Sequence, residues 1–236
     1  MTDSLTVPAR FNGPPETGNG GYTCGLVAAL LDAEVATVSL RAPPPLERPL
    51  AVARDGERVE VHDGETLVAE VRPADLSLDV PEAVSPDQAQ AASDAGREAW
   101  TAQHPFPRCV VCGPARERGD GLRLFPGRLD DGRYAVPWRP DESVGDDDGN
   151  VRRECVWAAL DCPTSAPVAN FGEGPPVVLG SLTARVDEPV RVGEPHAIVS
   201  WPLEVDGRKR HAAAALFDAG GHVIAASRAI WIELRG

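Results

Sequence analysis

Two carboxylates, Glu154 and Asp161, lie seven positions apart in a segment that is predicted to be helical, residues 151–160 with Asp161 at its end. Seven residues are close to two helical turns, so both carboxylates are expected on one face. A buried carboxylate without a cationic partner has a raised pKa and can take a proton from water near neutral pH. Each residue also has a structural alternative: Asp161 could cap a helix that ends before Pro163, and Glu154 could complement the helix dipole.

A glycine-rich loop, Gly18-Asn19-Gly20-Gly21, precedes a second apolar segment, residues 22–33, that is also predicted to be helical. The first N–H groups of a helix lack intrahelical partners and lie at the positive end of its dipole, so they bind negatively charged oxygen. Glycines let a carbonyl group approach these N–H groups closely, and the Asn19 amide could add a donor. The alternative is a sharp loop that only enters the helix, with Asn19 as its cap.

Five cysteines are present, an odd number in a chain that is long enough to fold without disulfides, so we expect reduced thiols. Cys109-x-x-Cys112-Gly113 has the shape of one half of a zinc knuckle. Cys155 and Cys162, separated by six residues, do not have the spacing of the second half. We therefore predict no metal and no cofactor, and interpret Cys109 and Cys112 as thiols packed in a tight turn.

The net charge of −13 excludes some classes of partner. A strongly acidic surface repels phosphate backbones and anionic lipid, so we expect no nucleic acid and no membrane partner. The chain has no long apolar segment and no secretory signal, which predicts a cytoplasmic protein. Lys209 is the only lysine among 23 basic residues, a bias typical of GC-rich bacterial genomes.

The two halves of the chain have the same order of elements: a helical segment and then strands joined by tight turns. Asp-Gly pairs at 55–56, 63–64 and 206–207 separate alternating segments, which is a strong hairpin signal. A short match between residues 39–43 and 183–189 supports an internal duplication. The predicted strands are residues 50–54, 57–62, 65–72, 181–187, 196–204, 209–217 and 222–234.

These elements predict an α+β protein built from two similar units. Strands joined by hairpins form antiparallel sheets, and a helix that is apolar on all sides must be buried. We therefore expect a central helix wrapped by a curved antiparallel sheet in each half, the two packed as one pseudo-dimer. Residues 1–85 would form the first unit, 86–105 a helical linker, and 106–236 the second unit.

Short motifs in both halves resemble the thioesterase-like hotdog superfamily. Asn19-Gly20-Gly21-Tyr22 is similar to the helix entry of double-hotdog acyl-CoA thioesterases. Cys109 to Gly113, followed by Gly121-Leu122, is similar to an opening seen in single-hotdog relatives, and residues 157–161 (WAALD) resemble the central helix of that family. The resemblance spans residues 11–234 and implies a double hotdog.

The resemblance implies hydrolysis of an acyl-CoA or a related acyl thioester. Asn19, Gly20 and Gly21 would stabilise the thioester oxygen, and Asp161, supplied by the other helix, would activate water. Glu154 and Thr164 are further catalytic candidates. The substrate-binding candidates are Tyr22, Trp157, Ser165, Arg152 and Arg153, the two arginines for coenzyme A phosphates. Trp138, Trp201 and Trp231 could join Trp157 in lining an acyl pocket, although strand tryptophans are more often core residues.

Several alternatives stay open at the level of sequence. Thr164 and Ser165 could be plain loop residues, and Arg152 and Arg153 could be solvated surface residues. Many relatives have a histidine where this chain has Asn19, and no histidine lies near either helix start in the sequence, so hydratase chemistry is not expected. The second helix entry lacks a glycine pair, which predicts one site per chain.

A non-catalytic hotdog that binds an acyl thioester or another apolar ligand is the competing hypothesis. The acyl chain, the carrier and the oligomeric state, with a homo-oligomer as one option, are not predicted.

Overall fold

The computed structural model describes residues 4–102, 104–169 and 175–235. Its helices are α1 (Gly20–Ala28), α2 (Pro86–Ala102) and α3 (Arg153–Asp161). Its strands are β1 (Ser4–Leu5), β2 (Val35–Leu40), β3 (Leu50–Asp55), β4 (Arg58–Asp63), β5 (Thr66–Pro73), β6 (Gly127–Arg128), β7 (Tyr134–Trp138), β8 (Val177–Val186), β9 (His196–Asp206), β10 (Lys209–Phe217) and β11 (Val223–Glu233). Within those ranges no helix has both the length and the apolar character needed to span a bilayer.

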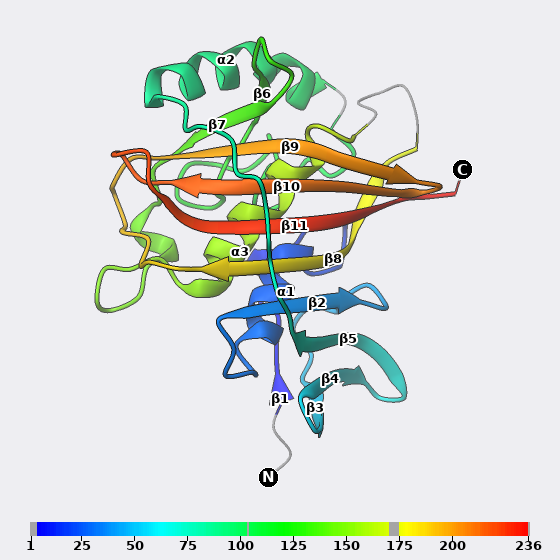
Figure 1. The fold of residues 1–236 in the computed structure, drawn as a ribbon. Helices are drawn as coiled ribbons and strands as arrows, with labels where there is room; N and C mark the ends of the chain where they lie inside the picture. Colours follow the sequence, from blue (N-terminus) through cyan, green and yellow to red (C-terminus); the bar gives the residue numbers. More distant parts are fainter. Residues whose placement is uncertain (1–3, 103, 170–174, 236) are drawn as a thin grey trace.

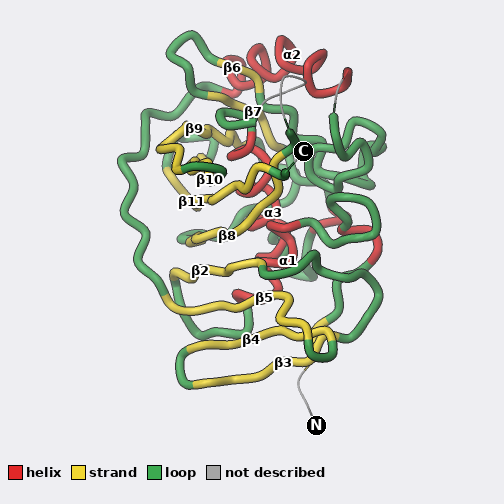
Figure 2. The backbone as a smooth tube through the Cα atoms, turned by 90° about the vertical axis from the view of Figure 1, so that its right-hand side faces the viewer, coloured by secondary structure: helices red, strands yellow, loops and turns green. Residues whose placement is uncertain are grey.

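The strands form one continuous antiparallel sheet with the order β1-β3-β4-β5-β2-β8-β11-β10-β9-β7-β6 (Figure 1). Helices α1 and α3 lie on the same face of this sheet, as Figure 2 shows in a view turned by 90°. Helix α2 lies at the end of the sheet formed by β6 and β7 and packs against these two strands. The expected α+β class and the antiparallel strands are thus present.

The expectation of two separate sheets was wrong. Strands β2 and β8 pair antiparallel, with Thr37 opposite Thr183, and their side-chain oxygens are 2.7 Å apart. The pairing joins the strands of the first half to those of the second. The physical reason is that an edge strand leaves a row of N–H and C=O groups unpaired, and pairing two edges satisfies both rows.

Helices α1 and α3 pack closely because α1 carries glycines at the contact. A Cβ atom added at Gly21 would lie 2.3 Å from the Asp161 Cβ and 2.9 Å from the Ala158 Cα. A Cβ added at Gly25 would lie 2.4 Å from the Glu154 Cα. The start of α1 is therefore beside the end of α3, so the two helices run antiparallel. This arrangement brings the glycine-rich loop to Asp161.

Both helices are short, for local reasons. Helix α1 ends at Ala28, five residues before the predicted end, where Leu30 and Leu31 switch to tighter bonds with Val27 and Ala28. Helix α3 ends at Asp161, as expected from Pro163, which has no N–H to donate. A 3₁₀ turn, Cys162–Ser165, follows it.

The strands predicted from Asp-Gly turns are confirmed within two residues at each turn, as Gly56, Gly64 and Gly207 adopt the left-handed conformation that such turns need. Strand β8 is the exception, because it begins at Val177, four residues before its predicted start. The short strands β1, β6 and β7 were missed. A helix, α2, is present within residues 86–105, where one was predicted, and Trp100 attaches it to the residues before β6 because its indole N–H donates to the Pro126 carbonyl at 2.7 Å.

Candidate active site

A cavity of about 620 Å³ lies where the start of α1 meets the end of α3. Strands β8 and β11 and the segment 104–112 complete its wall. Most of the wall is apolar, with Leu40, Phe106, Val177, Leu179, Trp231 and Ile232 among its residues. Polar groups gather at one place, where Asn19, Gly20 and Asp161 line the cavity. An apolar cavity with a few convergent polar groups is the usual form of a small-molecule site.

The Asp161 carboxylate is held by the start of the other helix. Its Oδ2 accepts a hydrogen bond from the Gly21 N–H at 2.8 Å and one from the Asn19 amide at 3.3 Å. Asn19 is itself fixed, because its Oδ1 caps α1 by accepting from the Tyr22 N–H at 2.8 Å. Asp161 Oδ1 has no hydrogen-bond partner among the described residues. One oxygen is therefore held by hydrogen bonds, and the other is buried without a hydrogen-bond partner among the described residues.

Burial makes this carboxyl a weak acid. Asp161 is 1% exposed, and desolvation raises the pKa of its carboxyl to about 7. The neighbouring Cys109 thiolate raises this pKa further, whereas the Gly21 N–H and the Asn19 amide lower it. The carboxyl is thus suited to exchanging a proton with water at neutral pH. The Asp161 carboxylate therefore bonds to the start of α1. It does not cap the end of its own helix, which was the structural alternative.

One backbone N–H group at the start of α1 has no hydrogen-bond acceptor among the described residues. The Tyr22 and Thr23 N–H groups bond to Asn19, and the Gly21 N–H bonds to Asp161. For the Gly20 N–H, no acceptor is found among the residues that the structure describes. Gly20 lines the cavity, so this N–H is the group at the helix start that remains for a ligand oxygen.

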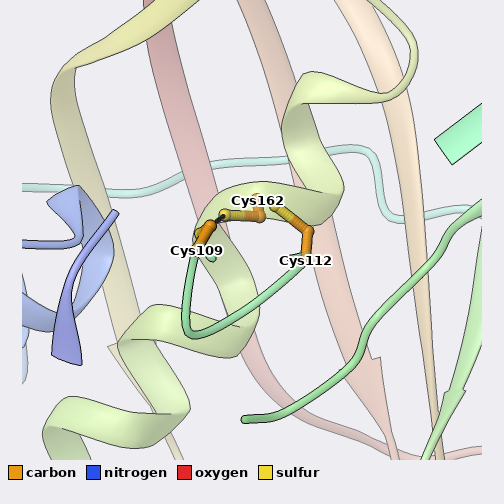
Figure 3. A group of neighbouring side chains, drawn as sticks. All are labelled: Cys109, Cys112 and Cys162. Carbon is orange, nitrogen blue, oxygen red and sulfur yellow. Dashed lines mark hydrogen bonds between the residues drawn. The ribbon is translucent and has the colours of Figure 1, made fainter. Parts of the chain in front are cut away.

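Three thiols lie close together, as Figure 3 shows. One of them is next to the carboxylate: Cys162 Sγ is 3.9 Å from Asp161 Oδ2. The Sγ atoms of Cys109, Cys112 and Cys162 lie within 4.8 Å of one another. Cys109 and Cys112 come from the loop after α2, and Cys162 follows Asp161 directly at the end of α3. The pKa of the Cys109 thiol is well below its usual range because Cys112 and Cys162 donate hydrogen bonds to it, and the N–H groups of Cys112 and Val111 do so as well.

The other residues predicted for chemistry lie away from the carboxylate. Glu154 contacts Gly25 along α1 instead of its start, and it pairs with Arg152 at 3.8 Å. Thr164 is buried: its hydroxyl donates to the nearby Asp161 carbonyl and accepts from the distant Trp231 indole N–H. Ser165 lines the cavity, but its hydroxyl donates to the Cys162 carbonyl at 2.7 Å. The hydroxyls of Thr164 and Ser165 both donate to nearby backbone carbonyls, as expected if these are loop residues.

The predicted substrate-binding residues are mostly core. Tyr22 is buried and stacks on Phe11 with ring centroids 3.8 Å apart. Trp157 is fully buried and does not line the cavity, whereas Trp231 does. Neither Arg152 nor Arg153 lines it either: Arg152 donates to the Ser143 carbonyl and Arg153 is exposed. The arginine of the cavity wall is Arg41, which also pairs with Glu70.

Among the cavity residues that were not predicted from the sequence, three lie at the end of α2 or shortly after it. His104 lines the cavity with Asn19, although it is distant from both helix starts in the sequence. Trp100 and Phe106 line it as well, from the end of α2 and the loop after it. The signal that could have found them is the segment 104–113 itself, in which a histidine, aromatic and cysteine residues occur close together.

Comparison with known sequences gives no assignment: no family model matches this chain, and no curated protein matches it. Solved structures do match. A candidate thioesterase from Novosphingobium aromaticivorans is 14% identical, with a TM-score of 0.63, over 99% of this chain and 95% of that chain. A tesB protein from Mycobacterium avium subsp. paratuberculosis is 14% identical, with a TM-score of 0.58, over 98% and 91%.

A third match is a conserved protein of unknown function with the hot dog fold from Alicyclobacillus acidocaldarius. It is 13% identical, with a TM-score of 0.54, over 99% of this chain and 93% of that chain. A structure described as a thioesterase superfamily protein matches over 48% of this chain and 57% of its own, at 20% identity and a TM-score of 0.43. The full-length matches establish the fold: this chain has the hot dog fold.

Proposed function

We propose that the chain hydrolyses an acyl-CoA or a related acyl thioester. The observation that carries the proposal is the Asp161 carboxylate at the wall of an apolar cavity, with Oδ2 held by Gly21 and Asn19 and Oδ1 without a protein partner. A fixed base beside a helix start is what activation of water next to a carbonyl group requires. The apolar wall suits an acyl chain.

The reaction would proceed by attack of water. Asp161 Oδ1 takes one proton from the water, and the oxygen forms a bond to the thioester carbonyl carbon. The negative charge that develops on the carbonyl oxygen is stabilised by the Gly20 N–H and the dipole of α1. The C–S bond then breaks, the thiolate leaves with a proton from Asp161, and a carboxylic acid is formed.

The proposal includes two hotdog units that share this site. Residues 1–85 supply the helix start and residues 106–236 supply the carboxylate, so the site is complete only where the two units meet. The antiparallel packing of α1 on α3 supports this division, as does the pairing of β2 with β8. The linker, residues 86–105, contributes to the cavity wall through Trp100 and His104.

The test is a thiol-release assay with acyl-CoA substrates of increasing chain length and with an aromatic acyl-CoA. We expect turnover of at least one substrate, and its loss in Asp161→Asn, which keeps the shape of the side chain but removes the base. Circular dichroism verifies that the variant is folded. Equal turnover by the variant and the original chain would exclude Asp161 as the base.

Binding without turnover is the second candidate. It is favoured by one observation: Asp161 already occupies the Gly21 N–H, so this donor is not open to a substrate oxygen. Isothermal titration calorimetry with acyl-CoA distinguishes the two functions. Heat of binding with no release of thiol supports a binding module, whereas product formation in the same cell supports the hydrolase.

A further inference from the structure

The three thiols at the end of α3 have a geometry that packing alone does not require. Cys109 Sγ and Cys162 Sγ are 3.8 Å apart, and Cys112 Sγ lies within 4.8 Å of both. A disulfide would need about 2.05 Å between two sulfurs. Zinc binds thiolates at about 2.3 Å, so two ligands of a tetrahedral site are separated by about 3.8 Å. The Cys109–Cys162 distance of 3.8 Å matches that of two ligands of one metal ion, and it also fits an S–H···S contact between two thiols.

The turn between Cys109 and Cys112 has the form of a metal knuckle. The Sγ atoms of Cys109 and Cys112, two residues apart in this turn, lie within 4.8 Å of each other. Gly113 closes the turn with an N–H bond to the Cys109 carbonyl at 2.9 Å, and a Cβ there would lie 2.6 Å from the Cys109 N atom. Glycine is therefore required at this position, and the two-residue spacing lets both sulfurs face one point.

Further donors surround the sulfurs. The Asn19 amide lies 3.8 Å from Cys109 Sγ and 3.7 Å from Cys162 Sγ. His104 Nε2 lies 3.2 Å from Cys112 Sγ. Hydrogen-bond donors that converge on sulfur stabilise thiolates. The Asn19 amide and a neutral His104 are uncharged donors, so they bring no positive charge to the sulfurs.

His104 is better placed as a partner of a thiolate than as a metal ligand. Its Nδ1 accepts a hydrogen bond from the Phe106 N–H at 3.0 Å, so the ring proton of the neutral histidine is on Nε2. An Nε2 that carries a proton donates to Cys112 Sγ and has no lone pair for a metal. The protein ligands are then three thiolates, and the fourth position of a tetrahedral ion is left to a ligand that is not a protein side chain of this set.

We propose that Cys109, Cys112 and Cys162 bind one zinc ion beside the Asn19–Asp161 pair. Cys162 replaces the second half of the knuckle that the sequence lacks. The ion would attach the loop after α2 to the residue that follows Asp161, and so fix the carboxylate in position. Metal binding is independent of thioester hydrolysis, because it is measured on the purified chain without a substrate.

The experiment begins with the full chain, expressed with zinc and purified without chelators. We expect one zinc per chain by elemental analysis. After removal of zinc, Co²⁺ should give the visible bands of a tetrahedral site together with thiolate-to-cobalt charge transfer in the near ultraviolet. A chain that holds no zinc and gives no cobalt spectrum, or one whose intact mass shows a disulfide between Cys109 and Cys162, overturns the proposal.

Variants then identify the ligands. Cys109→Ser and Cys162→Ser should lose stoichiometric zinc, whereas the matched control Cys155→Ser, a buried thiol on the same helix outside the cluster, should retain it. His104→Gln should keep the metal with about 10–100-fold weaker affinity, as expected for a partner of a ligand. Loss of zinc in Cys155→Ser as well, or complete loss in His104→Gln, contradicts the three-thiolate set. Because a cysteine variant can fail to fold, the zinc content of the unmodified chain decides the proposal by itself.

Discussion

The starts of α1 and α3 differ although the helices have the same length, nine residues, and pack side by side. Helix α1 begins with Asn19 as a side-chain cap and two glycines, and it faces a buried aspartate. Helix α3 begins with Arg152, which makes no side-chain cap bond, followed by Arg153 and Glu154. The comparison teaches that two helices packed side by side can present different groups at their starts: Asn19 and Gly20 line the cavity with Asp161, whereas residues 152–154 are not among its lining residues.

The largest expected effect is on catalysis at the α1 start. Asp161→Asn should lower kcat by about 10²–10⁴-fold, the usual contribution of a general base. Thiol release under saturating substrate measures it. A loss of less than tenfold would mean that the carboxylate positions other groups and does not take the proton.

The second expected effect is on the packing of the two helices. Gly21→Ala should lower the free energy of unfolding by about 1–3 kcal/mol, because the new methyl group overlaps the Asp161 side chain and the α3 backbone. Urea denaturation measures it. The counterpart at the α3 start, Glu154→Ala, serves as the control and should cost less, since it removes atoms at a half-buried position. Equal costs would contradict the asymmetry of the two starts.

A smaller effect is expected from the cap. Asn19→Ala should destabilise the fold by about 1 kcal/mol, because the Tyr22 N–H loses its acceptor. It should also lower turnover, since the Asp161 carboxylate loses one of its donors and keeps the Gly21 N–H and the Cys162 thiol. Asn19→Asp separates the two roles: an aspartate still caps the helix, but it donates nothing to Asp161 and adds a like charge beside it. Turnover that is unaffected by either substitution would remove Asn19 from the site.

The smallest expected effect is at the α3 start. Glu154→Gln should change kcat by less than about twofold and the free energy of unfolding by no more than about 0.5 kcal/mol, the range of substitutions away from special features. The reason is that Glu154 lies at Gly25 and has only an ion pair of 3.8 Å to a partly exposed arginine. A large loss of turnover would identify a second site at this start.

The sequence was sufficient for those parts of the fold that depend on local signals. Asp-Gly turns and alternating residues placed the strands β3, β4, β5, β9, β10 and β11, and Pro163 placed the end of α3. The end of α1 was missed because residues 29–33 continue the apolar pattern while their hydrogen bonds already tighten. The union of the sheets was missed because pairing between β2 and β8 depends on which edges meet, not on either strand alone.

For the candidate site, the resemblance brought Asn19, Gly20, Gly21 and Asp161 together, and the structure places these residues in contact. Glu154 shared a helical face with Asp161, as expected, but a shared face over two turns does not mean a shared site. The third thiol of the cysteine cluster was missed because Cys162 was compared with Cys155 along the helix. A ligand set is defined by distance in space, and Cys162 is 53 residues from Cys109 in the chain.

The pairing of β2 with β8 also has a consequence for the order of synthesis. Residues 35–40 leave the ribosome long before residues 177–186, so the first half must wait with an open edge on its outer strand. An open edge is a template for pairing with other chains. Asn19 and Asp161 are separated by 142 residues, so the polar pair of the cavity forms only after most of the chain has emerged. The polar pair of the cavity and the pairing that covers the open sheet edge therefore both form late in synthesis, once the second half of the chain is present.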